Sequence, residues 1–392
     1  MNDKNGILYN IDTFHTTYPN NINIKFYWND SNLHGYKIIN YDKKYICNDD
    51  IENGLYRSVI VSYPENKIVA FSPPKSITNT NTNIIYVNET IEGIMINLFY
   101  DARIKNWEIA TMSAISGNYY YSPKNSNANK NNTIHKKTFY QMFLDVIGST
   151  ENSILDELPK NYCYSFVLQH PDNPIVLKIN KPRLYLVAVY KPLNANNKKE
   201  KETIRLLLPT EYENWPVFSS TLCMIDFPRQ IDIRDCPNSW EQMNNTSIDD
   251  WAGVMFHLET GRRIKLDNPM YIQAKHIRNS NPILQYQYFS LRRVNQLCGF
   301  LYYFPKYKKI FQRFKRDIDE FITNIHTCYL HYYVYKIQMN ISIRYLPFIH
   351  KIHKEIYVPS TKITRNTVKE YVERFEPREL LYHLRRTQFT LD

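Results

Sequence analysis

The chain of 392 residues is long enough for two or three domains of roughly 150 residues each, and its hydrophobic content of 43% supplies a sizeable core. Its net charge of +11 favours a polyanionic partner such as nucleic acid, although the same excess also fits solvated lysines on an ordinary surface. The scattered cysteines argue against a disulfide framework and a structural zinc site. The lack of a long apolar run argues against a membrane protein, and the polar start of the chain argues against a secreted one, so we expect an intracellular location.

The first part of the chain predicts β-strands separated by turns. Residues 1–54 are polar, with Asn-rich turns and a short strand at 24–28, and we expect them to pack on the main domain as an extension. From Leu55 onward, alternating apolar runs bounded by turn residues predict strands at 56–61, 67–71, 84–87, 94–99 and 107–111.

The middle of the chain alternates between regular elements and polar loops. Low-complexity polar composition predicts loops at 117–135 and 194–201. Apolar residues at three- and four-residue spacing predict a helix over 138–147. Further strands are predicted at 162–168 and 184–190, short mixed elements at 203–250, and a strand pair at 253–258 and 263–266.

The last hundred residues have helical periodicity. Residues 306–336 contain no Gly or Pro, and their apolar residues recur at helical spacing. Thr367 and Glu370 form a capping-box pattern ahead of a second helix, and Pro377 fits the first turn of a third helix. We therefore expect a domain boundary near residue 295, with a basic, all-helical domain at 296–392.

The most specific signal lies between Ile68 and Gly117, where two apolar runs flank a Thr/Asn loop and the second leads into Glu92-Gly93. From Leu55 to Tyr271, the order and spacing of short motifs resemble the nucleotidyltransferase domain of T4 RNA ligase 1-like enzymes. The strings EGIMINLFYD and WEIAT are similar to those of a group carried by large DNA viruses of eukaryotes. The resemblance implies an α+β fold in which an antiparallel, β-rich, ATP-grasp-like ligase domain at 55–295 precedes the helical domain.

The resemblance also assigns a nucleotide site to Arg57, Lys75, Glu92, Gly93 and Lys265. In the family, residues matching Arg57 and Lys75 hold the ATP phosphates, and Lys265 keeps the first lysine of a Lys-x-Lys motif. We expect these three cations to face one groove beside Glu92. Each could instead be an ordinary strand-edge cation, and Glu92 an ordinary turn acid.

Four positions that carry the chemistry of the family have changed together in this chain. Thr90 stands where the family has the lysine that accepts AMP, and a hydroxyl group cannot form that phosphoramidate. Val167 and Ala252 replace carboxylates that hold ribose or Mg²⁺. Asp267 replaces the second lysine of the Lys-x-Lys motif and would repel a phosphate.

These losses favour a binding protein with a ligase-like fold, a pseudo-ligase that holds RNA or a nucleotide-bearing end without covalent chemistry and without an assigned cofactor. One alternative is an active, divergent RNA ligase or capping-type nucleotidyltransferase that uses ATP and Mg²⁺, with Lys75 as a displaced nucleophile. Another is a structural protein of a viral particle or replication compartment in the host cytoplasm.

Two features of the helical part also admit two interpretations. Interleaved cations and aromatic residues between Lys306 and Arg316 fit either a nucleic-acid surface or a solvated basic face. His350 and His353 have helical spacing, but no third ligand follows, so we expect a surface pair rather than a metal site.

Overall fold

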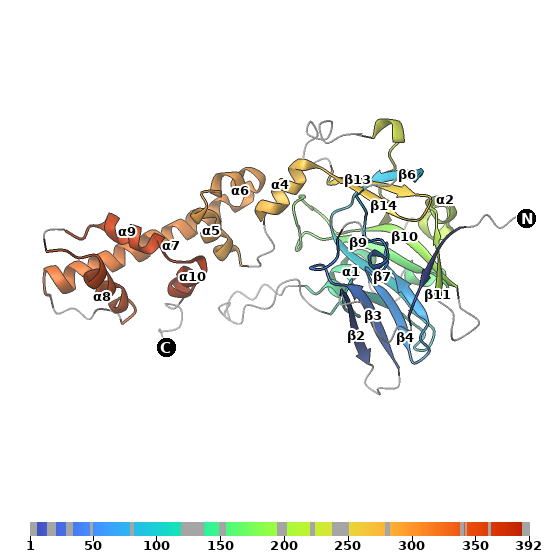
Figure 1. The fold of residues 1–392 in the computed structure, drawn as a ribbon, viewed down its shortest axis with the longest axis horizontal. Coiled ribbons are helices and arrows are strands. Elements are labelled where there is room, and N and C mark those ends of the chain that lie inside the picture. Colours follow the sequence, from blue (N-terminus) through green and yellow to red (C-terminus); the bar gives the residue numbers. More distant parts are fainter. Residues whose placement is uncertain are drawn as a thin grey trace, which may run out of the picture. The chain divides into compact units, whose positions relative to one another are not determined.

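A computed structural model gives the fold of the chain (Figure 1). It describes residues 6–13, 21–28, 34–47, 50–78, 82–118, 137–148, 154–193, 202–219, 224–236, 251–278, 283–337, 341, 343–359 and 362–385. The loops expected at 117–135 and 194–201 lie almost wholly outside these residues.

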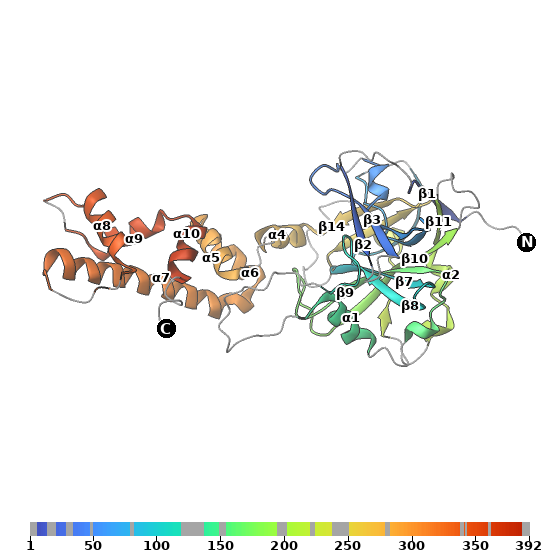
Figure 2. The same cartoon turned by 90° about the horizontal axis from the view of Figure 1, so that it is seen from below.

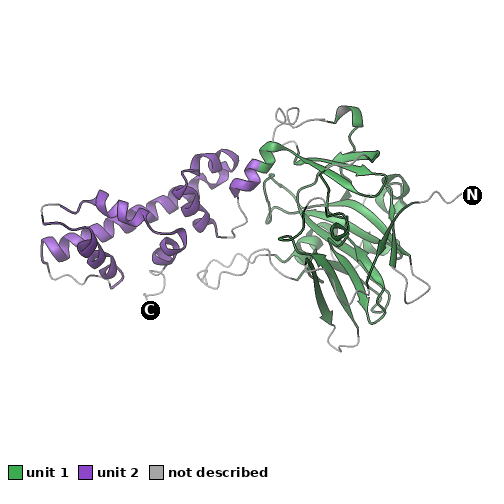
Figure 3. Cartoon of the chain, in the orientation of Figure 1, with its two compact units in different colours: residues 1–272 green, residues 273–392 purple. Residues whose placement is uncertain are grey.

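The chain divides into two compact units, residues 1–272 and residues 273–392 (Figure 3). The first unit is built of mostly antiparallel sheets and the second of helices, which confirms the expected α+β class with a helical C-terminal region. The boundary expected near residue 295 falls inside the second unit, which also includes α5 (Leu284–Arg293) and most of α4 (Pro269–Arg278).

The largest sheet of the first unit has seven strands within the described residues. Its strands are antiparallel except that β12 runs parallel to β10. Their order is β1 (Ile7–Ile11), β11 (Glu202–Leu207), β10 (Arg183–Leu193), β9 (Cys163–Gln169), β7 (Ile94–Asp101) and β8 (Asn106–Ala110), with β12 (Ile225–Asp226) beside β10.

Both faces of this sheet are covered, as Figure 2 shows for α1 (Phe139–Ile147) on one side and β2 (Ile22–Trp28) and β3 (Gly35–Tyr41) on the other. Alternate residues of a strand point to opposite faces. Phe166 therefore packs with Phe143 of α1, whereas its near neighbour Cys163 belongs to the core shared with β3, β4 (Val59–Tyr63) and β5 (Ile68–Phe71).

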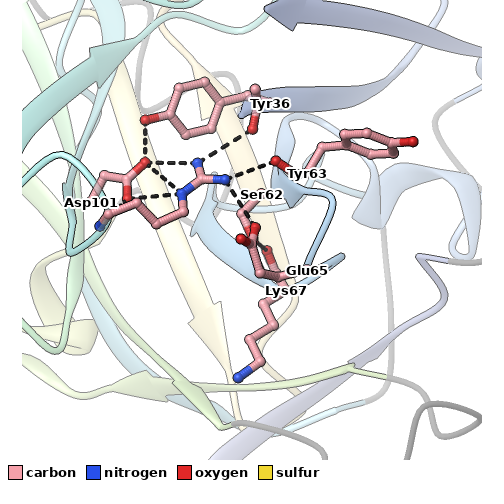
Figure 4. Close-up of polar contacts among 8 residues, drawn as sticks. Tyr36, Ser62, Tyr63, Glu65, Lys67 and Asp101 are labelled. Carbon is pink, nitrogen blue, oxygen red and sulfur yellow. Dashed lines mark hydrogen bonds and ion pairs between the residues drawn. The ribbon is translucent and has the colours of Figure 1, made fainter. Parts of the chain in front are cut away.

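Strands β2, β3, β4 and β5 form a four-stranded sheet in that order, so residues 1–54 contribute strands to both large sheets. Arg103 fastens this sheet to the end of β7 through hydrogen bonds to Asp101, Tyr63 and Glu65, which Figure 4 labels. Its guanidinium donates to both carboxylate oxygens of buried Asp101, to Glu65 and to the carbonyl oxygen of Tyr63, while the Tyr36 hydroxyl donates to Asp101 at 2.5 Å.

The third sheet is small and lies beside the candidate site. It has the order β14 (Arg263–Asp267), β13 (Gly253–Leu258) and β6 (Ile84–Glu89). Another helix of this unit, α2 (Pro209–Tyr212), is a single turn that follows β11. The strand pair predicted at 253–258 and 263–266 is confirmed as β13 and β14.

The second unit packs around one long helix, α7 (Lys308–Tyr329), which continues into a π-helical turn at Leu330–Val334. Its buried stripe includes Phe311, Ile318, Phe321, Ile322, Ile325 and Tyr329, and α8 (Leu346–Glu355), α9 (Arg365–Glu373) and α10 (Pro377–Arg385) contact it. A further helix, α6 (Leu297–Tyr303), packs against α5.

One predicted helix start is wrong. The capping box of α9 is formed by Thr364 and Thr367, three residues before the pair that the sequence indicated. The Thr364 hydroxyl accepts a hydrogen bond from the backbone of Thr367, so the helix begins at Arg365.

Candidate functional site

A cavity of about 260 Å³ lies in the first unit, where strands of the small sheet and of the seven-stranded sheet both contribute side chains. Basic, polar and apolar residues share its wall. The lining residues are Tyr41, Arg57, Lys75, Ser76, Asn88, Glu89, Thr90, Ile91, Gly93, Met95, Val167, Val187, Pro228, Met255, His257, Arg263 and Lys265.

The cavity brings together residues that are more than 200 positions apart in the sequence. Arg57, Lys75, Thr90, Gly93 and Lys265 all line it, as the sequence motifs led us to expect. Glu92 is not among the lining residues. The three cations therefore line the same cavity as Thr90.

Backbone pairing explains why the cations converge. Arg57 follows the 3-10 turn Asn53–Leu55, and the N–H of Lys75 donates to a carbonyl oxygen of that turn at 2.9 Å. Ile77 then bridges to β14, the strand that carries Lys265. The segment around Lys75 is thus fixed both to the turn before Arg57 and to the strand of Lys265.

Thr90 lies just beyond β6, and its backbone N–H donates to the Gly253 carbonyl oxygen at 2.8 Å. Its side-chain oxygen is buried and has no hydrogen-bond partner among the residues that the structure describes. A buried hydroxyl without a partner loses the hydrogen bonds that water would give it, so a ligand that contacts Thr90 would recover that cost.

Glu92 has a structural role that differs from the expected place beside the groove. Its carboxylate accepts hydrogen bonds from the backbone N–H groups of Ile175, Val176 and Leu177 at 3.0 to 3.2 Å, and it also bonds the side chain of Tyr271. Burial raises the pKa of Glu92, and these hydrogen bonds oppose that rise. The carboxylate is therefore committed to holding the segment around residue 176.

Close packing between two strands explains why the residue after Glu92 is a glycine, Gly93. The start of β7 passes so close to β9 that a Cβ on Gly93 would lie 2.5 Å from the carbonyl oxygen of Leu168 and 2.6 Å from a methyl carbon of Val167. Any side chain here would push the two strands apart. The Glu-Gly pair is thus required by local packing, whatever happens at Thr90.

Lys265 is paired within its own strand. Its ammonium nitrogen lies 2.5 Å from Oδ1 of Asp267, two residues along β14. The expectation that Asp267 would act directly on a bound phosphate needs correction, because Asp267 does not line the cavity and instead compensates the charge of Lys265.

Arg263 is a site residue that the motif comparison missed. It lies two residues before Lys265 on β14 and lines the same cavity, with only 8% of its surface exposed. Burial, reinforced by the charge of Arg57, lowers the pKa of Arg263 to about 10. The period-2 alternation of the predicted strand was a signal that could have placed residues 263 and 265 on one face.

A buried neutral histidine forms another part of the wall. His257 stacks on Tyr86, with ring centroids 4.0 Å apart, and its Nε2 donates to Oδ1 of Asn88 at 3.2 Å. Burial lowers the pKa of His257 well below its usual value, and the charge of Arg263 adds to the effect. The imidazole therefore supplies a flat neutral surface at physiological pH, a feature without a sequence motif.

The two positions that the resemblance matches to carboxylates are apolar and buried. Val167 lines the cavity at 7% exposure, and Ala252 is nearly inaccessible. Within the described part of the chain, no three His, Cys, Asp or Glu side chains gather into a metal-binding group. Glu89 is the carboxylate on the cavity wall, and it accepts a hydrogen bond from the Arg229 backbone at 3.0 Å.

The second unit carries the positive charge of the protein. Residues 273–392 contain 21 Lys and Arg against nine Asp and Glu, a net charge of +12, whereas residues 1–272 contain 28 against 29. Six exposed cations at the start of α7 have no ion pair within the described residues: Lys306, Lys308, Lys309, Arg313, Lys315 and Arg316. Helical periodicity puts Lys309, Arg313 and Arg316 on the side of α7 away from its buried stripe.

The His350–His353 pair bonds to tyrosines of the preceding helix. Nδ1 of His353 lies 3.0 Å from the hydroxyl of Tyr329, and Nδ1 of His350 lies 2.8 Å from that of Tyr333. The pair therefore helps fasten α8 to the end of α7.

No protein-family model matches the sequence, and no curated protein is similar to it. Among the described residues, no helix has the length and apolar character needed to cross a membrane.

Proposed function

We propose that this protein is a pseudo-ligase: a nucleic-acid-binding protein, with RNA as its principal ligand, that has a nucleotidyltransferase-like fold and has lost adenylation. It holds strands or nucleotide-bearing ends non-covalently. The observation that carries the proposal is that Arg57, Lys75, Lys265 and Thr90 line one cavity, where Thr90 is the residue that the resemblance matches to the nucleophilic lysine.

The chemistry of the cavity supports binding rather than adenylate transfer. Attack on an α-phosphorus requires a free amine. Thr90 offers a hydroxyl, and the ammonium group of Lys265 is paired with Asp267. Val167, which the resemblance matches to a metal- or ribose-binding carboxylate, is an apolar residue of the cavity wall.

The charge distribution supports a polyanionic ligand. The helical unit carries +12 and displays unpaired cations at the start of α7 within its described residues, so it attracts a phosphate backbone. The cavity then offers a second cationic surface in the first unit.

The direct test is an electrophoretic shift assay with short single-stranded RNA and DNA at about 50 and 200 mM salt. We expect RNA to bind and its affinity to fall by about tenfold or more over that range. The double variant Arg57→Gln/Lys265→Gln should bind more weakly, whereas Arg234→Gln, an exposed cation outside the cavity, should match the wild type. Absence of binding at low salt, or binding that ignores salt, would contradict the proposal.

A second candidate function is an active nucleotidyltransferase that uses a displaced lysine, because Lys75 lines the same cavity as Thr90. Incubation with labelled ATP or GTP and Mg²⁺ or Mn²⁺, followed by a denaturing gel, separates the two functions. An acid-labile label that disappears in Lys75→Met would establish the enzyme, and the pseudo-ligase predicts no label.

A further inference from the structure

The cavity contains a buried cation for which the described residues supply no anion. Arg263 is 92% buried; one terminal nitrogen of its guanidinium donates to the Pro74 carbonyl oxygen at 2.6 Å, and its Nε has no hydrogen-bond partner in the described part of the chain. The groups that act on it most strongly are Arg57 and the tyrosines Tyr190, Tyr9 and Tyr86, not a carboxylate.

Such an arrangement is costly for a protein without a ligand. A buried charge is normally paired, and a buried N–H donor is normally bonded. Here a second guanidinium, that of Arg57, lines the same cavity and adds repulsion, while the Thr90 hydroxyl is a second buried polar group without a partner among the described residues. An oxyanion with several acceptor oxygens is the class of ligand that complements two guanidinium groups and a hydroxyl group on one cavity wall.

We propose that the cavity is a receptor for a terminal phosphomonoester of an RNA strand, held by Arg263, Arg57 and Thr90 through direct contacts and without a bridging metal ion. The inference rests on the proposed RNA-binding function and names the chemical group that the cavity accepts.

Size and charge favour a strand terminus over an internal phosphate. The cavity volume of about 260 Å³ is below the roughly 300–1,000 Å³ of ordinary small-molecule sites. An internal phosphodiester carries one negative charge, and the nucleic-acid strand continues from it in both directions. A terminal phosphomonoester continues in one direction only and approaches two negative charges at neutral pH, since its second pKa is about 6.

The donor set of the wall explains why direct contacts suffice. Mg²⁺ bound to a phosphate is usually held by one or two protein carboxylates. The carboxylate on this wall, Glu89, already accepts from the Arg229 backbone and lies 4.0 Å from its side chain. Guanidinium groups neutralise phosphate directly and in a bidentate manner.

The experiment compares one short RNA in four forms: with a 5′-phosphate, with a 3′-phosphate, with hydroxyl groups at both ends, and as a circle. Affinity is measured by fluorescence anisotropy on the full chain in EDTA. We expect one phosphorylated end to bind about tenfold tighter or more than the hydroxyl-ended strand. The circle should behave like the hydroxyl-ended form, and the preference should shrink below about pH 6, where the phosphate gains a proton.

Variants assign the preference to the cavity. Arg57→Gln and Thr90→Val should reduce the preference for the phosphorylated end, and Arg263→Met should abolish it. The preference is measured in each variant as the ratio of its affinities for the phosphorylated and the hydroxyl-ended strand, so a general loss of RNA affinity cancels, whereas Arg234→Gln should keep the full preference. Circular dichroism identifies any variant that fails to fold. If Arg263→Met is one of these, Arg57→Gln still decides the test, because Arg57 is only half-buried and its substitution should preserve the fold.

The contrary outcomes are distinct. Equal affinity for all four forms would overturn the end receptor while leaving RNA binding intact. A preference that requires added Mg²⁺ would overturn the metal-independent contact. No binding of any form at low salt would instead remove the proposed function itself.

Discussion

Nζ of Lys265 lies 2.5 Å from Oδ1 of Asp267, and the two residues are separated by one position on β14. Strand alternation places them on the same side, together with Arg263. The acid therefore lowers the effective charge of one cavity cation, while Arg263 has no such partner within the described residues. Of the two cations that β14 contributes to the cavity wall, Arg263 is the one without a carboxylate among the described residues, and it is buried.

Removing the carboxylate of Asp267 should strengthen anion binding in the cavity. In Asp267→Asn, Lys265 regains an uncompensated charge, and we expect RNA affinity at low salt to rise about three- to tenfold. The rise should fade as salt increases because salt screens partly exposed charges. The double variant Lys265→Gln/Asp267→Asn is the matched control and should lack the gain. Unchanged or weaker binding in Asp267→Asn would show that Lys265 does not bind the ligand.

Glu92 should be needed for stability rather than for ligand binding. Glu92→Ala leaves the N–H groups of Ile175, Val176 and Leu177 without their acceptor, so we expect the free energy of unfolding to fall by about 2–4 kcal/mol. Glu92→Gln keeps one acceptor oxygen and should be less destabilised. Urea unfolding measures both, with exposed Glu157→Gln as the control. An Ala variant as stable as the wild type would refute this role.

The pH dependence of unfolding gives an independent check on Glu92. Its folded pKa is raised above the usual 4.5 because burial outweighs the hydrogen bonds. A carboxyl group of this kind stabilises the fold most below its unfolded pKa, and that contribution disappears as the pH rises through the folded pKa. The stability difference between wild type and Glu92→Gln should therefore shift in favour of the wild type as the pH falls toward 4.5. A difference independent of pH would contradict the raised pKa.

The hydrogen-bond network around Arg103 should change stability with pH in the direction opposite to that expected for Glu92. Burial raises the pKa of Asp101, but hydrogen bonds from Arg103 and Tyr36 outweigh it and lower the pKa overall. This contribution is present above the usual 3.8 and disappears as the pH falls through the folded pKa. Arg103→Met should cost about 3–5 kcal/mol at neutral pH, because it leaves a carboxylate that is 3% exposed without its cation.

Tyr36→Phe removes one hydrogen bond from the same carboxylate and keeps the cation, so it should cost about 1–2 kcal/mol. Arg229→Gln, a cation that is 64% exposed, serves as the control and should be close to neutral. Equal stability of Arg103→Met and the wild type in urea unfolding would argue against this network as the fastening between the sheets.

The basic face of α7 predicts a salt-dependent contribution to RNA affinity. The triple variant Lys309→Gln/Arg313→Gln/Arg316→Gln removes three exposed cations without touching the buried stripe. RNA binding should weaken by about tenfold or more, and the slope of log affinity against log salt should fall by about 0.7 for each phosphate that is no longer neutralised.

The control for α7 is Arg365→Gln/Lys369→Gln, because these cations are already paired with Asp319 and Glu373. This pair of substitutions should have a much smaller effect on RNA binding. If both variants weakened binding equally, the effect would follow the net charge of the unit rather than the α7 face.

The sequence by itself determined the local elements. The apolar pattern that predicted a strand at 94–99 and the spacing that predicted a helix at 138–147 both depend only on residues that are close in sequence. The structure has β7 and α1 at those positions. Alternation also sufficed to predict the strand pair around residues 253–266, because a short hairpin leaves little choice of partner.

Only the tertiary structure decided which of these residues meet. Arg57, Thr90 and Arg263 share a cavity because sheet register and one bridge at Ile77 align segments that are distant in sequence. Local patterns carry no information about such pairings, since long-range contacts form only when the whole core packs. For the same reason the sequence could not show that Glu92 accepts hydrogen bonds from the backbone near residue 176. Nor could it show that Asp267 compensates the charge of Lys265, while Arg263 has no anion among the described residues.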